Sequence, residues 1–243
     1  MSIALPHGHG ASQGHARARR MALFGGTFDP IHNGHLAVAR AAERRFHLDQ
    51  IHFIPTARPP HKHSGDMASY TDRYAMVALA CAGHPRFIAS FAESGAEPGA
   101  GDSGGEVFYS VDTVKRFKQK YDEPDTHLYF LLGADSFLQI PTWKDYETLL
   151  GLCDFIVASR PGFRVDALRL VIPPELLARP GSGHAQLDPH AIALRRTTIY
   201  VLDTVASYVS ATQVRGRLDR NESIHGLVPS RVEEYITKQA LYR

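Results

Sequence analysis

The stretch that decides the fold is Gly25-Gly26-Thr27-Phe28-Asp29-Pro30-Ile31-His32-Asn33-Gly34-His35-Leu36. An apolar segment at 21–24 leads into this run, and a segment of helical composition at 36–43 leads out of it. This order predicts a buried strand, a glycine turn and the N-terminus of a helix. Such a turn directs backbone N–H groups and the positive end of a helix dipole at one point, which suits a phosphate group.

Two histidines in this run are the first candidate catalytic residues. His32 and His35 are three positions apart, so on a first helical turn they would share a face. Two imidazoles beside an anion site can donate hydrogen bonds to phosphate oxygens as charge builds in a transition state. A glycine pair also suits an ordinary strand-end turn, and single histidines are often surface or core residues. The complete twelve-residue run, in its strand–turn–helix context, favours a functional site.

Composition narrows the class of protein. The chain has 243 residues, 44% of them hydrophobic, and a formal net charge of +2, which gives no strong electrostatic case for nucleic-acid or membrane binding. No run of 18 apolar residues and no apolar core of a signal peptide is present, so we expect a cytoplasmic protein. Cys81 and Cys153 form no CxxC pair and no zinc set, and we expect buried free thiols in a reducing compartment.

The pattern along the chain predicts an α/β protein. Residues 1–20 are rich in Gly, His, Ala and Arg, and we expect a flexible arm followed by a single domain at 21–243. The predicted strands are 21–25, 50–55, 86–91, 127–133, 154–159 and 197–202, and the predicted helices are 34–46, 71–82, 110–121, 143–151 and 229–241. This alternation indicates a Rossmann-like doubly wound fold, with a mainly parallel sheet and helices on both faces.

Two segments interrupt the alternation. The low-complexity stretch 94–105 is predicted to be a surface loop without chemistry, and 161–196 is predicted to be irregular, wrapping the surface or forming a lid. Ligands in doubly wound sheets bind beyond the carboxyl ends of the strands. The glycine–histidine turn lies at such an end.

The run at 25–36 resembles the HxGH signature of the adenylyl- and cytidylyltransferase superfamily, and in its extended form it resembles the bacterial nicotinate-nucleotide adenylyltransferase family. The similarity covers roughly residues 21–243. It implies a nucleotidyltransferase of NAD biosynthesis, which transfers the adenylyl group of ATP to nicotinate mononucleotide and releases pyrophosphate. The acceptor phosphate would attack the α-phosphate in line, so catalysis would rest on positioning and charge stabilisation rather than on a Ser or Cys nucleophile.

The resemblance assigns one set of residues to ATP. His32, His35 and Arg215 are the predicted catalytic residues. The predicted ATP-binding residues are Gly25, Gly26, Thr27, Phe28, His35, Asp135, Ser210, Thr212 and Arg215. In the segment 209–215, Ser210 can cap a helix and the planar fork of Arg215 can bind phosphates, whereas Ala211 stands where the family has a second Ser. The alternative for this segment is a capped helix with an exposed Arg.

A second set is assigned to the acceptor. The predicted residues are Lys62, Tyr109, Thr113, Asp135, Trp143 and Arg160. Lys62 ends the stiff run at 58–62, and Trp143 could stack on a pyridine ring. Helix-start N–H groups at 109–114 and the Thr113 hydroxyl could hold a pyridine carboxylate; Ser110 stands there for the usual Thr.

Each of these assignments has a plain alternative. Lys62 could be a solvated turn residue, Asp135 and Ser110 could be helix N-caps, and Trp143 could belong to the core. Mg²⁺ is expected with ATP, held by phosphate oxygens and water, because the sequence shows no carboxylate cage for a protein-bound metal.

Two other functions stay open. A sister transferase could adenylate nicotinamide mononucleotide or phosphopantetheine, and a nucleotide-binding sensor could use the same fold without catalysis. The expected partners are therefore ATP and nicotinate mononucleotide, with no nucleic acid and no membrane. The sequence leaves open whether the chain forms a homo-oligomer.

Overall fold

The computed structural model gives the arrangement of most of the chain. It describes residues 18–57, 67–94, 108–123, 125–160, 162–179, 190–203 and 209–242. Residues outside the described ranges include 1–17 of the arm predicted at 1–20, most of the loop predicted at 94–105 and the whole run at 58–62.

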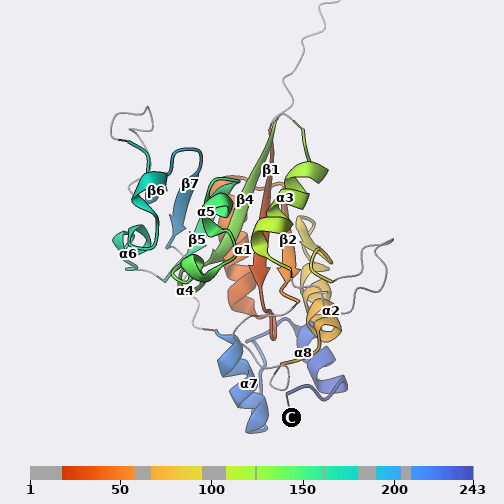
Figure 1. Ribbon diagram of the computed structural model, residues 1–243. Coiled ribbons are helices and arrows are strands. Elements are labelled where there is room, and N and C mark those ends of the chain that lie inside the picture. Colours follow the sequence, from red (N-terminus) through yellow and green to blue (C-terminus); the bar gives the residue numbers. More distant parts are fainter. Residues whose placement is uncertain are drawn as a thin grey trace, which may run out of the picture.

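The described strands form one twisted sheet in the order β3-β2-β1-β4-β5-β7-β6 (Figure 1). They are β1 (Arg19–Gly26), β2 (Gln50–Pro55), β3 (Phe87–Ala89), β4 (Thr126–Gly133), β5 (Asp154–Ala158), β6 (Ala191–Ala193) and β7 (Thr198–Leu202). All neighbouring pairs are parallel except β6–β7, which is antiparallel. The strand order reverses direction beside β1, so a crevice for a ligand is expected at the carboxyl ends of β1 and β4.

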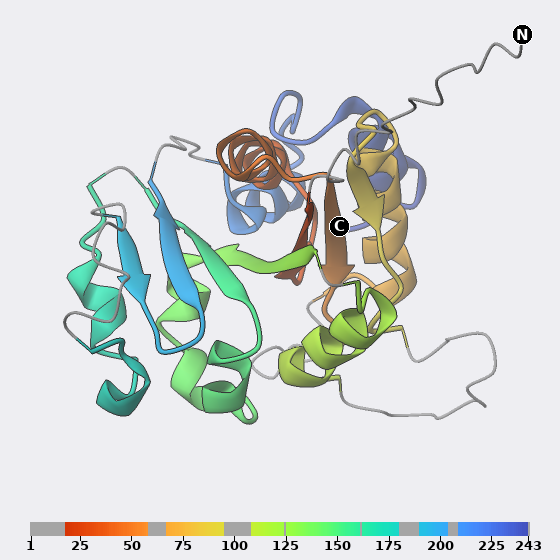
Figure 2. The ribbon, with the colours of Figure 1, turned by 90° about the horizontal axis from the view of Figure 1, so that it is seen from above.

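Helices cover both faces of the sheet. The helices are α1 (Asn33–Phe46), α2 (Tyr70–Cys81), α3 (Ser110–Lys120), α4 (Ala134–Phe137), α5 (Tyr146–Leu150), α6 (Asp166–Arg169), α7 (Ala211–Asp219) and α8 (Ser230–Lys238), with 3₁₀ turns η1 (Ile140–Thr142) and η2 (Pro174–Leu176). Figure 2 shows α1 on one face and α3 on the other.

The two faces have separate hydrophobic cores because side chains alternate along a strand. In β1, Ala22 and Phe24 face the core under α1, α2 and the C-terminal helices. Met21 and Leu23 face the core under α3 to α6. A central strand buried on both faces reads as a continuous apolar run, which is why the segment at 21–24 was recognisable in the sequence.

The C-terminal third closes the carboxyl end of the sheet. In Figure 1, α7 and α8 lie below the ends of β1 and β2, and α8 lies next to α2. Tyr235 on α8 donates a hydrogen bond to Asp72 on α2, with 2.9 Å between the hydroxyl and Oδ1. Asn33, between the two histidines, donates from its backbone N–H to Leu227 O and from its side chain to Gly226 O, each at 2.8 Å.

The predicted Rossmann-like, mainly parallel sheet is confirmed, while some boundaries were wrong. Strand β1 begins at Arg19, inside the predicted arm, because Arg19 and Arg20 pair with the start of β4. The helix predicted at 143–151 is shorter: Trp143 ends η1, and α5 begins only after Asp145, whose φ of 49° breaks the helical path.

The described residues of the segment 161–196 form more regular structure than predicted. It contains α6, η2 and the edge strand β6, and Leu177 forms a bridge to Leu194. The short length of these elements hid their periodicity in the sequence. Cys81 and Cys153 are both free and buried, as predicted. In the part of the chain that the structure describes, no helix is long and apolar enough to span a membrane.

Candidate active site

The paired histidines lie at the point where β1 gives way to α1. His32 is the N-cap residue of α1, and the ring of His35, one turn later, stacks on it with 3.7 Å between ring centroids. The first turn of α1 carries no acidic residue, so nothing offsets the positive end of the helix dipole there. The prediction that the two imidazoles share a face is confirmed.

A hydrogen bond fixes the tautomer of His35. The backbone N–H of His32 donates to His35 Nδ1 at 3.2 Å, so a neutral His35 carries its proton on Nε2. Burial, and then the neighbouring His32, hold the pKa of His35 well below its usual value. Burial also lowers the pKa of His32 to about 4. Both rings are therefore neutral hydrogen-bond donors near pH 7.

His32 retains an unused polar atom. Its Nδ1 is buried and has no hydrogen-bond partner among the described residues. Buried polar atoms without a partner are uncommon in native proteins. The His32 ring stands at a helix N-terminus, where an anion would find backbone N–H groups.

The glycine turn needs its glycines because an aromatic ring folds beneath it. Phe28 has a φ of 49°, in the left-handed region, and its ring is buried against His35 with 5.0 Å between centroids. A Cβ on Gly26 would lie 3.1 Å from this ring. The side chain of Phe28 supports His35 from below, so a contact of Phe28 with ATP would come from its backbone.

Arg215 approaches the same turn from the C-terminal third. It lies on α7, whose N-cap Ser210 accepts a hydrogen bond from the backbone N–H of Gln213 at 3.2 Å, as predicted for a capped helix. Arg215 Nη1 donates to the carbonyl of Asp29 at 2.6 Å and lies 3.5 Å from Asp29 Oδ2. Arg215 thus stands beside the turn although 186 residues separate it from Asp29. Thr212 lies in the first turn of α7, next to it along the helix.

Arg73 holds several backbone carbonyls in place, a role that was not predicted from the sequence. It is fully buried on α2 and donates to the carbonyls of Thr27 and Thr56, each at 2.8 Å, and of Ala57 at 3.3 Å. These carbonyls belong to the segments that leave β1 and β2, so one guanidinium fixes both at the carboxyl edge. The sequence does carry one indication of this role. Arg73 shares the buried face of its helix with Met76 and Val77, and a charged residue on an apolar face is unusual.

On the other side of the edge lie the residues predicted for the acceptor. Tyr109 is the N-cap of α3 and is 37% exposed, and Lys144 Nζ lies 4.2 Å from the centre of its ring. Lys144 also pairs with Asp112 at 3.3 Å. These contacts bring the start of α3 beside Trp143. The Trp143 ring meets Phe130 edge-on, with 6.1 Å between centroids, and the Phe130 ring lies under Gly25.

Thr113 is placed differently from the prediction. Its side chain is buried, and its hydroxyl donates to Glu93 Oε1 at 3.2 Å. Arg116 lies 3.4 Å from the same hydroxyl and donates to Ala92 O at 2.9 Å. Burial raises the pKa of Glu93 to about 7, against the opposing hydrogen bonds from Thr113 and Ala57. The sequence around Glu93 does not predict that it is buried and accepts a hydrogen bond from Thr113, because a single acidic residue after a short strand is common.

The remaining predicted residues are spread along the edge. Asp135 is exposed in the first turn of α4, and the N-cap of that helix is Gly133, so the alternative of Asp135 as an N-cap was wrong. Tyr109, not Ser110, is the N-cap of α3. Arg160 is exposed after β5, two strands along the sheet from β1. Lys62 lies outside the described residues.

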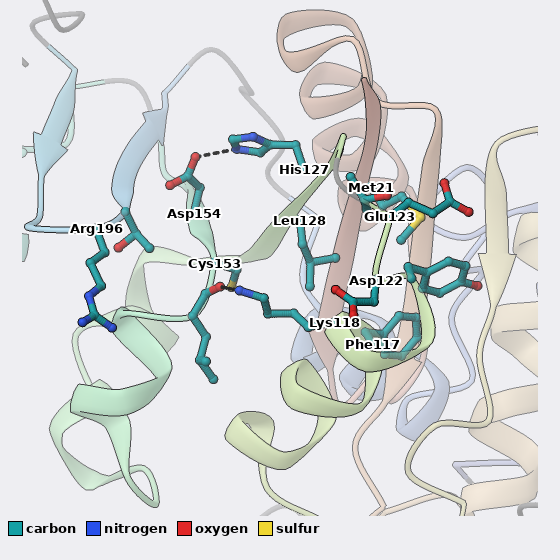
Figure 3. A pocket seen from close by; sticks show the side chains of 14 residues that line it. Met21, Phe117, Lys118, Asp122, Glu123, His127, Leu128, Cys153, Asp154 and Arg196 are labelled. Carbon is teal, nitrogen blue, oxygen red and sulfur yellow. Dashed lines mark hydrogen bonds and ion pairs between the residues drawn. The ribbon is translucent and has the colours of Figure 1, made fainter. Parts of the chain in front are cut away.

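A cleft of about 230 Å³ opens at the opposite edge of the sheet, near the starts of β1, β4 and β5 (Figure 3). Its polar groups largely face one another. His127 Nε2 lies 2.7 Å from Asp154 Oδ2, and Lys118 donates to Leu152 O at 2.8 Å. Parallel α/β sheets bind ligands at the carboxyl ends of their strands, so this cleft is not the site that the histidines define.

Among the described residues, no group of three or more His, Cys, Asp or Glu gathers where it could hold an ion. The described side chains therefore do not form a cage for a resident magnesium ion.

The reversal of strand order at β1, the helix N-terminus and the neutral histidine pair define a nucleotide-binding protein of the Rossmann-like class. A family model described as "Cytidylyltransferase-like" matches residues 23–217. The chain is 40% identical to a protein named "Probable nicotinate-nucleotide adenylyltransferase" from Moorella thermoacetica, over 93% of each chain. A relative of the same name from Citrifermentans bemidjiense is 38% identical and covers 92% of this chain and 98% of its own.

The chain belongs to the nicotinate-nucleotide adenylyltransferase family, within the cytidylyltransferase-like proteins. A solved structure, the Plasmodium falciparum nicotinic acid mononucleotide adenylyltransferase complexed with NaAD, superposes with a TM-score of 0.65. It covers 92% of this chain and 97% of its own at 17% identity, and at that identity it supports the fold alone.

Proposed function

We propose that this protein transfers the adenylyl group of ATP to nicotinate mononucleotide, giving nicotinate adenine dinucleotide and pyrophosphate. The observation that carries the proposal is the stacked pair of neutral histidines at the N-terminus of α1, with Arg215 beside the same turn. Membership of the family supports the choice of both substrates.

The geometry suggests how the reaction is assisted. The acceptor phosphate attacks the α-phosphate of ATP, the new P–O bond forms as the bond to the β-phosphate oxygen breaks, and pyrophosphate leaves. His35 Nε2–H and the buried ring of His32 donate hydrogen bonds to phosphate oxygens that gain charge. Arg215 neutralises charge on the departing pyrophosphate. A neutral imidazole donates through its one N–H group, so the rings need not take up a proton before they act as donors.

Mg²⁺ is proposed to enter with ATP rather than to occupy a site of its own. It would bridge phosphate oxygens and reduce their negative charge. Dialysis of the protein against a chelator followed by metal analysis should leave no magnesium on the free protein. Tightly held magnesium in the absence of ATP would contradict this assignment.

The test of the reaction is pyrophosphate release with ATP and Mg²⁺, comparing nicotinate mononucleotide, nicotinamide mononucleotide and phosphopantetheine as acceptors. We expect a strong preference for the first. A preference for either of the others would keep adenylyl transfer but replace the acceptor. ATP binding without pyrophosphate release from any acceptor would favour a nucleotide-binding sensor.

A further inference from the structure

The C-terminal tail reaches the turn that carries the catalytic histidines. The hydroxyl of Tyr242 donates to Asp29 Oδ1 with 2.7 Å between the two oxygens, across 213 positions of the sequence. The tail gets there by an unusual path. Ala240 has a φ of 50° and Tyr242 a φ of 63°, both in the left-handed region that residues with a Cβ seldom adopt. Backbone held in that region indicates that the surroundings require it.

Asp29 is the point where this contact and Arg215 meet. Its side chain is 1% exposed, and its Oδ1 accepts from Tyr242 and, at 3.1 Å, from the backbone N–H of Ala68. Two donors on Oδ1 fix the plane of the carboxylate. Its Oδ2 then lies 3.5 Å from Arg215 Nη1, the same nitrogen that donates to the carbonyl of Asp29.

The surroundings of the Tyr242 hydroxyl keep it protonated, so that it always donates to Asp29. Burial, and then the carboxylate of Asp29, raise the pKa of Tyr242, so the phenol stays protonated and donates at any physiological pH. A hydrogen bond between a neutral donor and a buried carboxylate is among the stronger kinds in proteins.

We propose that Tyr242 is a positioning residue for Arg215: by holding Asp29 it sets the direction in which the guanidinium presents its free N–H groups to the phosphates of ATP. The proposal rests on the proposed function only in assigning Arg215 to ATP. It gives the tail at 239–242 a role in nucleotide binding beyond packing α8 onto the domain.

The experiment compares Tyr242→Phe with Tyr235→Phe. Each variant removes one phenol hydroxyl from the C-terminal segment, but the Tyr235 hydroxyl donates to Asp72 on α2 and not to Asp29. The dissociation constant for ATP is measured by calorimetry without acceptor, and kcat and the KM of each substrate are measured by pyrophosphate release. We expect Tyr242→Phe to weaken ATP binding about three- to tenfold, the size of a typical net hydrogen-bond contribution, because the lost bond acts on ATP only through Asp29 and Arg215.

The same variant should leave the KM of the acceptor unchanged, and Tyr235→Phe should bind ATP like the wild type. Equal ATP affinity in wild type and Tyr242→Phe would overturn the proposal. So would an equal loss in both variants, because that would show general docking of the C-terminal segment.

A double-mutant cycle separates positioning from structure. If Tyr242 acts through Arg215, adding Tyr242→Phe to Arg215→Ala should not weaken ATP binding further. Additive losses would overturn the proposal even if the single variant behaved as expected. Wild-type protein that binds ATP but adenylates no acceptor would overturn the proposed reaction while the ATP affinities still decide the role of Tyr242. Wild-type protein that binds no ATP would overturn both.

Discussion

The two sides of the carboxyl edge are built differently. On the side of the histidines, side chains from distant parts of the chain converge on one turn: Arg215 and Tyr242 on Asp29, and Arg73 on Thr27. On the side of Trp143 some contacts are exposed, such as Lys144 over the Tyr109 ring, and the buried hydrogen bond joins Thr113 to Glu93.

The difference follows from what each side is proposed to bind. Charged phosphates need donors held rigidly before the reaction, because preorganised groups stabilise developing charge without reorganising. A flat pyridinium ring can be held by stacking on a well-placed aromatic neighbour, which needs less rigid support. The two sides also differ in their buried titrating groups, neutral imidazoles on one and a carboxyl of raised pKa on the other. Five predictions test this contrast, from the largest expected effect to the smallest.

The largest effect is expected from His35→Ala. We expect kcat to fall by about 10²–10³, equivalent to about 2.7–4 kcal/mol, as for removal of an oxyanion donor. The measurement is steady-state pyrophosphate release, with circular dichroism showing that the variant is folded. An unchanged kcat in a folded variant would remove His35 from the mechanism.

Arg73→Met should act on stability rather than on the reacting groups. The substitution leaves the carbonyls of Thr27 and Thr56 without their donor, and we expect a loss of about 3 kcal/mol in the free energy of unfolding. Urea unfolding followed by fluorescence measures it. Arg86→Met, at an exposed ion pair with Glu43, is the matched control and should cost no more than about 1 kcal/mol. Similar losses in the two variants would contradict the assigned role of Arg73.

Glu93→Gln should change how stability depends on pH. The folded protein keeps Glu93 protonated up to about pH 7, whereas the unfolded chain ionises near pH 4.5, so the unfolded state binds fewer protons between these values. The free energy of unfolding of the wild type should therefore fall by roughly 3 kcal/mol relative to the variant as pH rises from 4.5 to 7.

The contribution of His32 to the pH dependence of stability should have the opposite sign to that of Glu93. Its folded pKa of about 4 lies below the ordinary 6.5, so the unfolded state binds more protons between these values and stability falls as pH falls. Parallel urea titrations of Glu93→Gln, His32→Asn and wild type between pH 4 and 8 measure both slopes. If the free energy of unfolding depends on pH equally in wild type and in Glu93→Gln, then the pKa of Glu93 is not raised in the folded protein.

The smallest effect is expected from Trp143→Ala. Loss of a stacked ring should raise the KM of the acceptor about two- to tenfold and leave the KM of ATP unchanged, because Trp143 lies on the acceptor side only. Trp143→Phe should recover part of the loss. A rise in the KM of ATP alone would place Trp143 on the ATP side and contradict its assignment to the acceptor.

The two sides also differ in how far the sequence predicts them, because one depends on a local motif and the other on contacts between distant segments. His32 and His35 were found because their spacing sits inside one continuous strand–turn–helix unit, where local rules decide geometry. The hydroxyl of Thr113 was assigned to a ligand, and in the structure it donates a hydrogen bond to Glu93, which lies in the turn after β3. The edge strand β6 was missed because three residues carry no readable period.

By itself the sequence determined the parallel sheet, the phosphate-binding turn and the family, because apolar alternation and a contiguous motif are local properties of the chain. Only the tertiary structure decided which side chains hold that motif in place. Arg73, Glu93 and Tyr242 have no local pattern that marks them as partners. Their roles arise from hydrogen bonds across 16 to 213 positions, which exist only once the sheet and the C-terminal helices have packed.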